Sequence, residues 1–221
     1  MRIHASAPGK LVLSGEYAVL EGAPALVLAV DARARVVVED SDRDFHVAAP
    51  DVGVPDARFV FEQGRVQWLD LDVAQHEVLS LATRVIQNFG EDQPPFRISL
   101  DTRDFSLRGE KFGLGSSAAL AVALAGALCE RAQREAPRVE ELIALHRAWQ
   151  NDRGSGVDVA SSCCGSLSIY RLRDGAPDIE RTRWPRGLRR RCIWTGKAAS
   201  TSAKLRKLSE WRAREPVTYS A

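Results

Sequence analysis

The stretch that most constrains this chain is "EKFGLGSSAALAVALAGAL", residues 110–128. It places two glycines and two serines directly before a run of small apolar residues. The run predicts a buried helix from about Ser116 to Arg134, because alanine and leucine favour helix and small side chains allow close packing. Glycines allow positive φ, so the backbone before the helix can turn its N–H groups toward one point. The stretch therefore predicts either a phosphate-binding loop at a helix N-terminus or a tight turn capped by Ser116.

Two common nucleotide-binding motifs do not fit this stretch. Gly113–Ala118 matches GxGxxA, but that motif must follow a strand directly, and eleven residues separate the predicted strand 96–101 from Gly113. A P-loop requires GxxxxGK[ST]; the Gly-Lys pairs Gly9-Lys10 and Gly196-Lys197 are followed by leucine and alanine. The Rossmann and P-loop folds are therefore excluded.

The hydrophobic patterns predict a chain of mixed strands and helices. Apolar runs and alternation predict strands at 3–13, 25–39, 96–101, 166–172 and 191–196, with short strands and loops over 45–70. Helical spacing predicts helices at 72–89, 116–134, 139–150 and 202–213, and a loop leading into a short helix at 154–165. Residues 173–187 are expected to be a charged link. Without regular β-α-β alternation, the predicted fold class is α+β.

Composition narrows the class of protein. Hydrophobic residues make up 45% of the chain and charged residues 27%, as in ordinary globular domains. No apolar run reaches the roughly 18 residues of a membrane span, and the four cysteines lack CxxC spacing, so a cytoplasmic protein without zinc is expected. From Arg186 onward, ten basic residues face two acidic ones. We interpret this basic end as a solvated surface, because it lacks the interleaved aromatic residues of single-strand nucleic-acid platforms.

Four stretches, taken in order, resemble the motifs of the GHMP kinases. They are "SAPGKLVLSGEYAVLEGAPAL" (6–26), "KFGLGSSAALAVAL" (111–124), "GSGVDVAS" (154–161) and "WTGKAASTS" (194–202). The resemblance implies an ATP-binding N-terminal domain over 1–187, with a ribosomal-protein-like two-layer α/β fold. It also implies that 188–221 begin an incomplete, ferredoxin-like C-terminal domain. The third glycine-rich motif of the family does not follow Gly196, so a fragment or a shortened protein is expected.

The resemblance also implies residue roles. The ATP phosphates would be bound by Lys111, Gly113, Leu114, Gly115, Ser116, Ser117 and Ala118. Asp158 would accept the proton of the attacking oxygen or orient that oxygen, and Lys10 would stabilise the developing charge or keep Asp158 ionised. Ser117 would contact Mg²⁺. Arg147 stands eleven residues before Asp158, in the region where mevalonate-acting members carry a metal-binding glutamate, so a second protein ligand is not assigned.

The acceptor side completes the expected site. The residues implied to bind the acceptor are Glu16, Tyr17, Gln150, Lys197, Ser200 and Thr201. His146, four residues before Gln150, is interpreted as a packed helix residue. Tyr17 follows Glu16 where mevalonate-acting members have histidine, so the motifs resemble the branch that converts ATP and 5-phosphomevalonate into ADP and 5-diphosphomevalonate.

Three readings of the activity therefore stay open. The first is kinase activity on 5-phosphomevalonate, the second is kinase activity on another acceptor such as mevalonate, and the third is a catalytically silent nucleotide binder. The expected partner is an anionic, phosphorylated small molecule, with neither nucleic acid nor membrane. A homodimer is compatible with all three readings.

Overall fold

The computed structural model describes residues 1–152, 154–196, 210–211 and 213–215. The strands are β1 (Arg2–Ser14), β2 (Ala25–Asp40), β3 (Phe45–Ala49), β4 (Val54–Glu62), β5 (Arg65–Trp68), β6 (Phe96–Asp101), β7 (Ser106–Leu107), β8 (Glu110–Lys111), β9 (Leu167–Arg173) and β10 (Ala176–Thr182). The helices are α1 (Val73–Val78), α2 (Ser80–Phe89), α3 (Ser116–Arg131), α4 (Val139–Trp149) and α5 (Val157–Cys164), with the 3₁₀ turns η1 (Ala18–Glu21), η2 (Pro50–Val52) and η3 (Arg103–Phe105).

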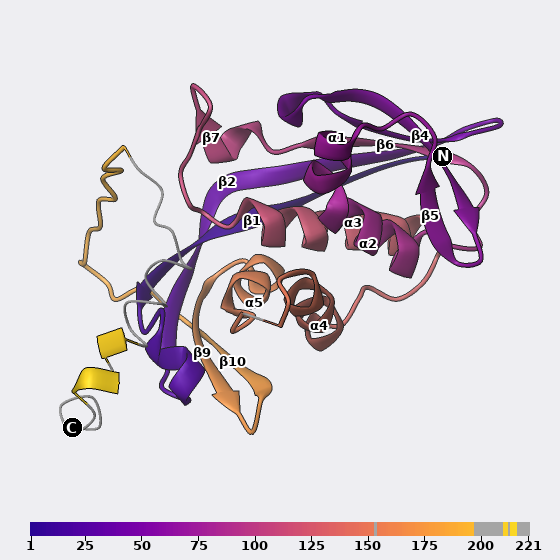
Figure 1. Ribbon diagram of the computed structural model, residues 1–221. Helices are drawn as coiled ribbons and strands as arrows, with labels where there is room; N and C mark the ends of the chain where they lie inside the picture. Colours follow the sequence, from indigo (N-terminus) through magenta and orange to yellow (C-terminus); the bar gives the residue numbers. More distant parts are fainter. Residues whose placement is uncertain (153, 197–209, 212, 216–221) are drawn as a thin grey trace.

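A long antiparallel hairpin, β1 with β2, organises an eight-stranded sheet (Figure 1). The second edge of β2 is divided: residues 25–28 pair with β9 and residues 35–40 pair with β6. The sheet order is therefore β10-β9-β2-β6-β3-β4-β5, with β1 on the other edge of β2. The register of β1 against β2 shifts between Pro8 and Gly9. Such a bulge bends the strand locally, so the residues at the shift are placed between the two halves of the sheet.

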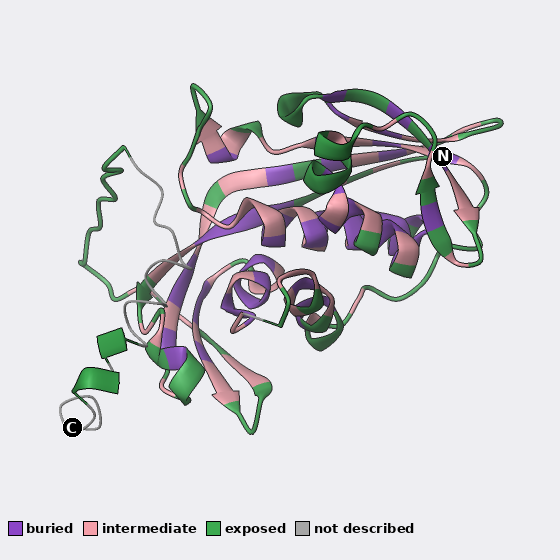
Figure 2. Ribbon diagram, in the orientation of Figure 1, coloured by how far each residue is buried: buried purple, intermediate pink, exposed green. Residues whose placement is uncertain are grey.

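The helices gather on one side of this hairpin. Helices α3 and α5 contact β1 and β2, while α2 packs on α3 and α4 packs on α5. In Figure 2 the buried colour is concentrated where these helices meet the strands. Alternation in β6 buries Phe96, Ile98 and Leu100 toward this layer, as expected for a sheet with one buried face. The prediction of an α+β fold with helices layered on a sheet is confirmed.

Two local predictions were wrong in an instructive way. The expected link 173–187 contains β10, because Asp174 and Gly175 both have positive φ and form a tight turn that returns the chain along β9. The expected helix 72–89 is interrupted at Leu79, so α1 and α2 are separate. The Asp-Gly pair was a turn signal that the charged composition of the segment obscured.

Of the predictions for the C-terminal region, one is wrong and the others concern residues outside the described ones. Residues 191–196 form no strand: Ile193 is 87% exposed, and no strand among the described residues pairs with this segment. The predicted helix 202–213 and most of the expected second domain, 188–221, lie outside the described residues. Among the described residues, no helix is both long and apolar enough to cross a lipid bilayer.

Candidate active site

No side chain caps the amino end of α3, and two glycines in the preceding loop have the left-handed backbone conformation. Gly113 and Gly115 have φ of 77° and 76°, and Gly115 occupies the cap position without a side-chain cap. The alternative of a turn capped by Ser116 is therefore wrong. The Ala119 N–H donates to the Gly115 carbonyl at 3.1 Å, so the N–H groups of the first turn precede the helical ladder. These groups and the helix dipole favour an anion at this end.

Strand β1 holds this loop in place at the bulge. The backbone N–H of Lys10 donates to the Leu114 carbonyl at 2.8 Å. A Cβ on Gly9 would lie 2.6 Å from the same carbonyl oxygen, so only glycine allows this approach. A Cβ on Gly115 would lie 3.0 Å from Cγ of Lys10. The Lys10 side chain therefore runs directly beneath the loop.

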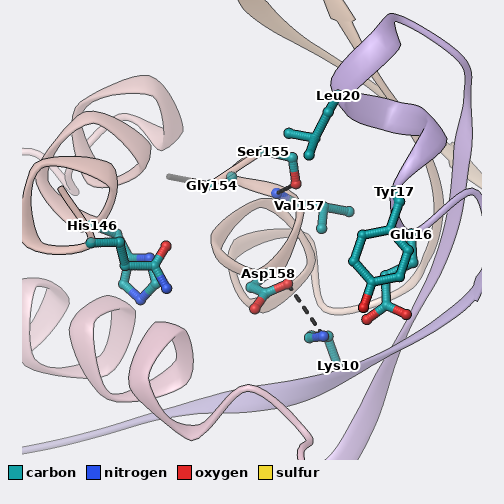
Figure 3. A pocket seen from close by; sticks show the side chains of 11 residues that line it. Lys10, Glu16, Tyr17, Leu20, His146, Gly154, Ser155, Val157 and Asp158 are labelled. Atoms are coloured by element: carbon teal, nitrogen blue, oxygen red, sulfur yellow. Dashed lines mark hydrogen bonds and ion pairs between the residues drawn. The ribbon is translucent and has the colours of Figure 1, made fainter. Parts of the chain in front are cut away.

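Asp158, on helix α5, forms an ion pair with Lys10. It lies in the first turn of α5, whose cap, Gly156, has φ of 83° and would place a Cβ 2.6 Å from Ile143 on α4. Oδ1 of Asp158 lies 3.4 Å from Nζ of Lys10 (Figure 3). The Lys10 side chain is 11% exposed and that of Asp158 is 33% exposed. A largely desolvated ammonium is thus paired with a carboxylate that still reaches the surface.

These two residues form the floor of a cleft. Its lining consists of Lys10, Glu16, Tyr17, Leu20, His146, Gln150, Gly154, Ser155, Gly156, Val157 and Asp158. Figure 3 shows Glu16 and Tyr17 on the side opposite His146, with Asp158 between them. The Tyr17 hydroxyl oxygen is buried and has no hydrogen-bond partner among the residues that the structure describes. Burial, and secondarily the charge of Glu16, raises the pKa of Tyr17, so the hydroxyl keeps its proton as a donor.

A second cavity adjoins the amino end of α3 from the other side. It is lined by Ala49, Asp51, Val52, Glu77, Val78, Leu79, Ser80, Leu81, Ala82, Leu100, Thr102, Lys111, Ser116, Ser117, Leu120 and Trp149. The first turn of α3 therefore contributes to this cavity, while Lys10 and Asp158 line the cleft. This arrangement suits a reaction between two ligands that meet at the helix end.

His146 lies in the wall of the cleft. It is 3% exposed, and its Nε2 lies 3.2 Å from Oγ of Ser117. Burial lowers the pKa of His146, and the charge of Asp158 opposes this shift only in part. The prediction of a packed histidine is correct as to burial, but sequence reasoning missed its contact with Ser117. The only signal was its spacing of four residues from Gln150.

The other predicted residues fall into three groups. Gln150 lines the cleft, and Lys111 lies exposed at the mouth of the second cavity. Leu114 and Ala118 belong to the loop and first turn described above. Lys197, Ser200 and Thr201 lie outside the described residues. Sequence reasoning did not anticipate the contribution of α1 and α2 to the second cavity.

The residues at the helix end fit a nucleotide phosphate and a cation held mainly by that phosphate. The described residues contain no group of three or more histidine, cysteine, aspartate or glutamate side chains that could bind a metal ion by themselves. Mg²⁺ commonly takes one or two protein oxygens and completes its shell with phosphates and water. The Ser117 hydroxyl and the Asp158 carboxylate are suitable oxygens.

Comparison with known proteins places this architecture in a family. Residues 76–166 match the family model described as the GHMP kinases N terminal domain. The chain is 32% identical to the phosphomevalonate kinase of Streptomyces sp. (strain CL190), covering 93% of this chain and 65% of that protein. It is 30% identical to the mevalonate kinase of Pyrococcus furiosus, covering 77% of this chain and 52% of that enzyme. The chain thus spans about half to two thirds of the length of these relatives.

Solved structures agree on the fold. The Lin0012 protein of Listeria innocua superposes with a TM-score of 0.77 at 23% identity, over 100% of this chain and 68% of that one. The Streptococcus pneumoniae phosphomevalonate kinase in complex with phosphomevalonate and AMPPNP gives a TM-score of 0.67 at 22% identity, over 94% and 67%. The chain belongs to the GHMP kinase family, whose N-terminal domain it carries. Within that family, its similarity extends to both phosphomevalonate and mevalonate kinases.

Proposed function

We propose that this chain is the nucleotide-binding part of an ATP-dependent kinase whose acceptor is 5-phosphomevalonate. One observation carries the proposal: the paired Lys10 and Asp158 lie beside an uncapped, glycine-flanked helix end. Phosphoryl transfer asks a protein chiefly to position two anionic groups and to offset their charge. The N–H groups at the start of α3 are suited to bind the nucleotide phosphates, and the cleft is suited to hold the acceptor.

Lys10 and Asp158 have complementary tasks in this scheme. The Lys10 ammonium, held beneath the phosphate loop, stabilises negative charge on the transferring group. The Asp158 carboxylate, paired with that ammonium, orients the attacking phosphate oxygen of the acceptor and accepts its proton if one is present. A bound Mg²⁺ would offset phosphate charge, with Ser117 as its protein contact.

The acceptor side of the cleft supports a ligand rich in oxygen atoms. The unpartnered Tyr17 hydroxyl is available to donate to the acceptor, and Gln150 offers an amide. Glu16 is suited to accept from a hydroxyl rather than to contact a phosphate, because two anions would repel. The similarity to a phosphomevalonate kinase over 93% of the chain favours 5-phosphomevalonate over mevalonate.

Initial rates of ADP release test the proposal. We expect a rate with 5-phosphomevalonate that exceeds the rates with mevalonate and without an acceptor. A higher rate with mevalonate would assign the chain to the other branch, and equal rates would remove the acceptor assignment. If no acceptor raises the rate, calorimetry with AMPPNP and Mg²⁺ distinguishes a silent nucleotide binder from a protein that binds no nucleotide.

A further inference from the structure

The hydrogen bond between His146 and Ser117 joins two helices at the centre of the site. His146 lies in the last turn of α4 and Ser117 in the first turn of α3, with Nε2 and Oγ 3.2 Å apart. His146 lines the cleft and Ser117 lines the second cavity. The bond therefore lies in the wall between the two spaces that the proposed function assigns to acceptor and nucleotide.

The surroundings of the imidazole restrict its role. His146 is 3% exposed and lies against the Trp149 ring, with centroids 5.4 Å apart. The indole N–H of Trp149 donates to Oγ of Ser80 at 3.0 Å, which ties the carboxyl end of α4 to α2. A side chain held in this way has little rotational freedom, so a hydrogen bond to it fixes the group that it contacts.

The hydroxyl group of Ser117 can adopt more than one orientation. A serine hydroxyl near the start of a helix can rotate and can hydrogen-bond to nearby backbone groups. If its proton points toward His146, both oxygen lone pairs remain available on the side of the second cavity. A neutral imidazole presents one donor nitrogen and one acceptor nitrogen, so it can accept that proton at Nε2.

We propose that His146 is a positioning residue: its Nε2 accepts a hydrogen bond from the Ser117 hydroxyl and thereby directs the lone pairs of the Ser117 oxygen toward the cation that accompanies the nucleotide phosphates. This inference rests on the proposed function, because it concerns the same nucleotide site. It assigns to a neighbouring helix the task of orienting a cation-binding oxygen before the nucleotide arrives. The contact does not require His146 to touch either substrate.

Histidine-ring ¹⁵N spectra of the nucleotide-free protein test the bond directly. The chain has four histidines, and loss of one signal in His146→Gln identifies the resonance. At neutral pH we expect the tautomer with an unprotonated Nε2, and a shifted Nε2 signal in Ser117→Ala. Ser116→Ala is the matched control, since its hydroxyl neighbours Ser117 in sequence and has no hydrogen bond with His146. A chemical shift typical of a protonated Nε2, or an Nε2 shift that stays the same in Ser117→Ala, would overturn the proposal.

Calorimetry with Mg²⁺ and AMPPNP tests the consequence. Loss of one orienting hydrogen bond should weaken binding about 3- to 10-fold in His146→Leu. His146→Gln retains a side-chain acceptor and should recover most of the affinity. The double variant His146→Leu/Ser117→Ala should bind no more weakly than Ser117→Ala, because both changes remove one interaction. Additive losses, or unchanged affinity in His146→Leu, would contradict the proposal.

The two experiments separate the failure of this inference from the failure of the proposed function. If the wild type does not bind AMPPNP, the proposed function fails, and the positioning role fails with it. If the wild type binds AMPPNP and the His146 resonance does not change in Ser117→Ala, only the positioning role fails. Thermal unfolding of His146→Leu and His146→Gln identifies any variant whose weaker binding reflects incomplete folding.

Discussion

The ammonium nitrogen of Lys10 lies 3.4 Å from a carboxylate oxygen of Asp158, although the two residues are far apart in the sequence, in β1 and α5. The pair exists because the Lys10 side chain passes beneath Gly115 and because Gly156 lets α5 begin close to α4. Both glycines have positive φ and leave no room for a Cβ without movement. The charge pair and the glycine-containing loop before α3 therefore depend on the same packing.

Asp158→Asn should separate chemistry from nucleotide binding. The amide keeps the size of the side chain but cannot accept a proton in the same way, so we expect turnover to fall roughly 10²- to 10⁴-fold. The affinity for AMPPNP should change little. Initial rates and calorimetry measure the two effects. Asp178→Asn is the control, because it removes an exposed ion pair with Arg173 on the β9–β10 hairpin; comparable losses in both variants would refute the role of Asp158.

Gly115→Ala should damage the nucleotide site more than its backbone strain explains. A left-handed alanine costs about 1–2 kcal/mol, and the new Cβ would also lie 3.0 Å from Lys10 Cγ. We expect lower stability in chemical denaturation and weaker AMPPNP binding. Gly109→Ala has a similar φ of +83° and no atom within 4 Å of the new Cβ, so it should lose stability alone. Equal AMPPNP affinity in the two variants would contradict this prediction.

Tyr17→Phe should weaken acceptor binding without destabilising the fold. The buried Tyr17 hydroxyl has no hydrogen-bond partner in the described part of the chain, so the free energy of unfolding should stay the same or rise slightly. Loss of a donor to the acceptor should raise KM for 5-phosphomevalonate about 3- to 10-fold. Tyr170→Phe provides the contrast: its hydroxyl donates to the Ser155 carbonyl at 2.5 Å, so that variant should lose stability. An unchanged KM in Tyr17→Phe would remove Tyr17 from the acceptor site.

His146 should make stability depend on pH below its usual pKa of 6.5. Burial lowers its pKa in the folded state, so the unfolded chain binds more protons in the window below 6.5. The contribution of His146 is complete above that pH and declines as the pH falls through the folded pKa. The free energy of unfolding, measured by urea denaturation at several pH values in this range, should depend less steeply on pH in His146→Gln than in the wild type. Identical slopes would indicate that His146 does not carry this dependence.

Gly126→Ala should stabilise the protein. Gly126 lies inside α3, and a Cβ there would have no atom within 4 Å. Alanine in a helix interior gains about 0.5–1 kcal/mol over glycine, so the midpoint of thermal unfolding should rise. Gly156→Ala should do the opposite, because its Cβ would lie 2.6 Å from Ile143. A lower midpoint for Gly126→Ala would show that the α3 surface is more crowded than the structure indicates.

Local pattern determined much of this protein. The alternation over 96–101 and the glycine-serine stretch before a small-residue run required only neighbouring residues to interpret, and β6 and α3 lie where they were expected. The order of the motifs also indicated the family. Periodicity and turn chemistry are properties of short segments, so these features can be recognised without knowledge of the rest of the chain.

Tertiary structure decided which residues of different segments contact one another. The bulge at Gly9, the support of the loop by Lys10, and the contact of His146 with Ser117 all join residues from different elements. The prediction of a strand at 191–196 was wrong for the same reason, since a strand requires a partner and the part of the chain that the structure describes supplies none to this segment. Which side chains come within hydrogen-bonding distance depends on sheet register and helix packing, and these are set by the burial of the whole core.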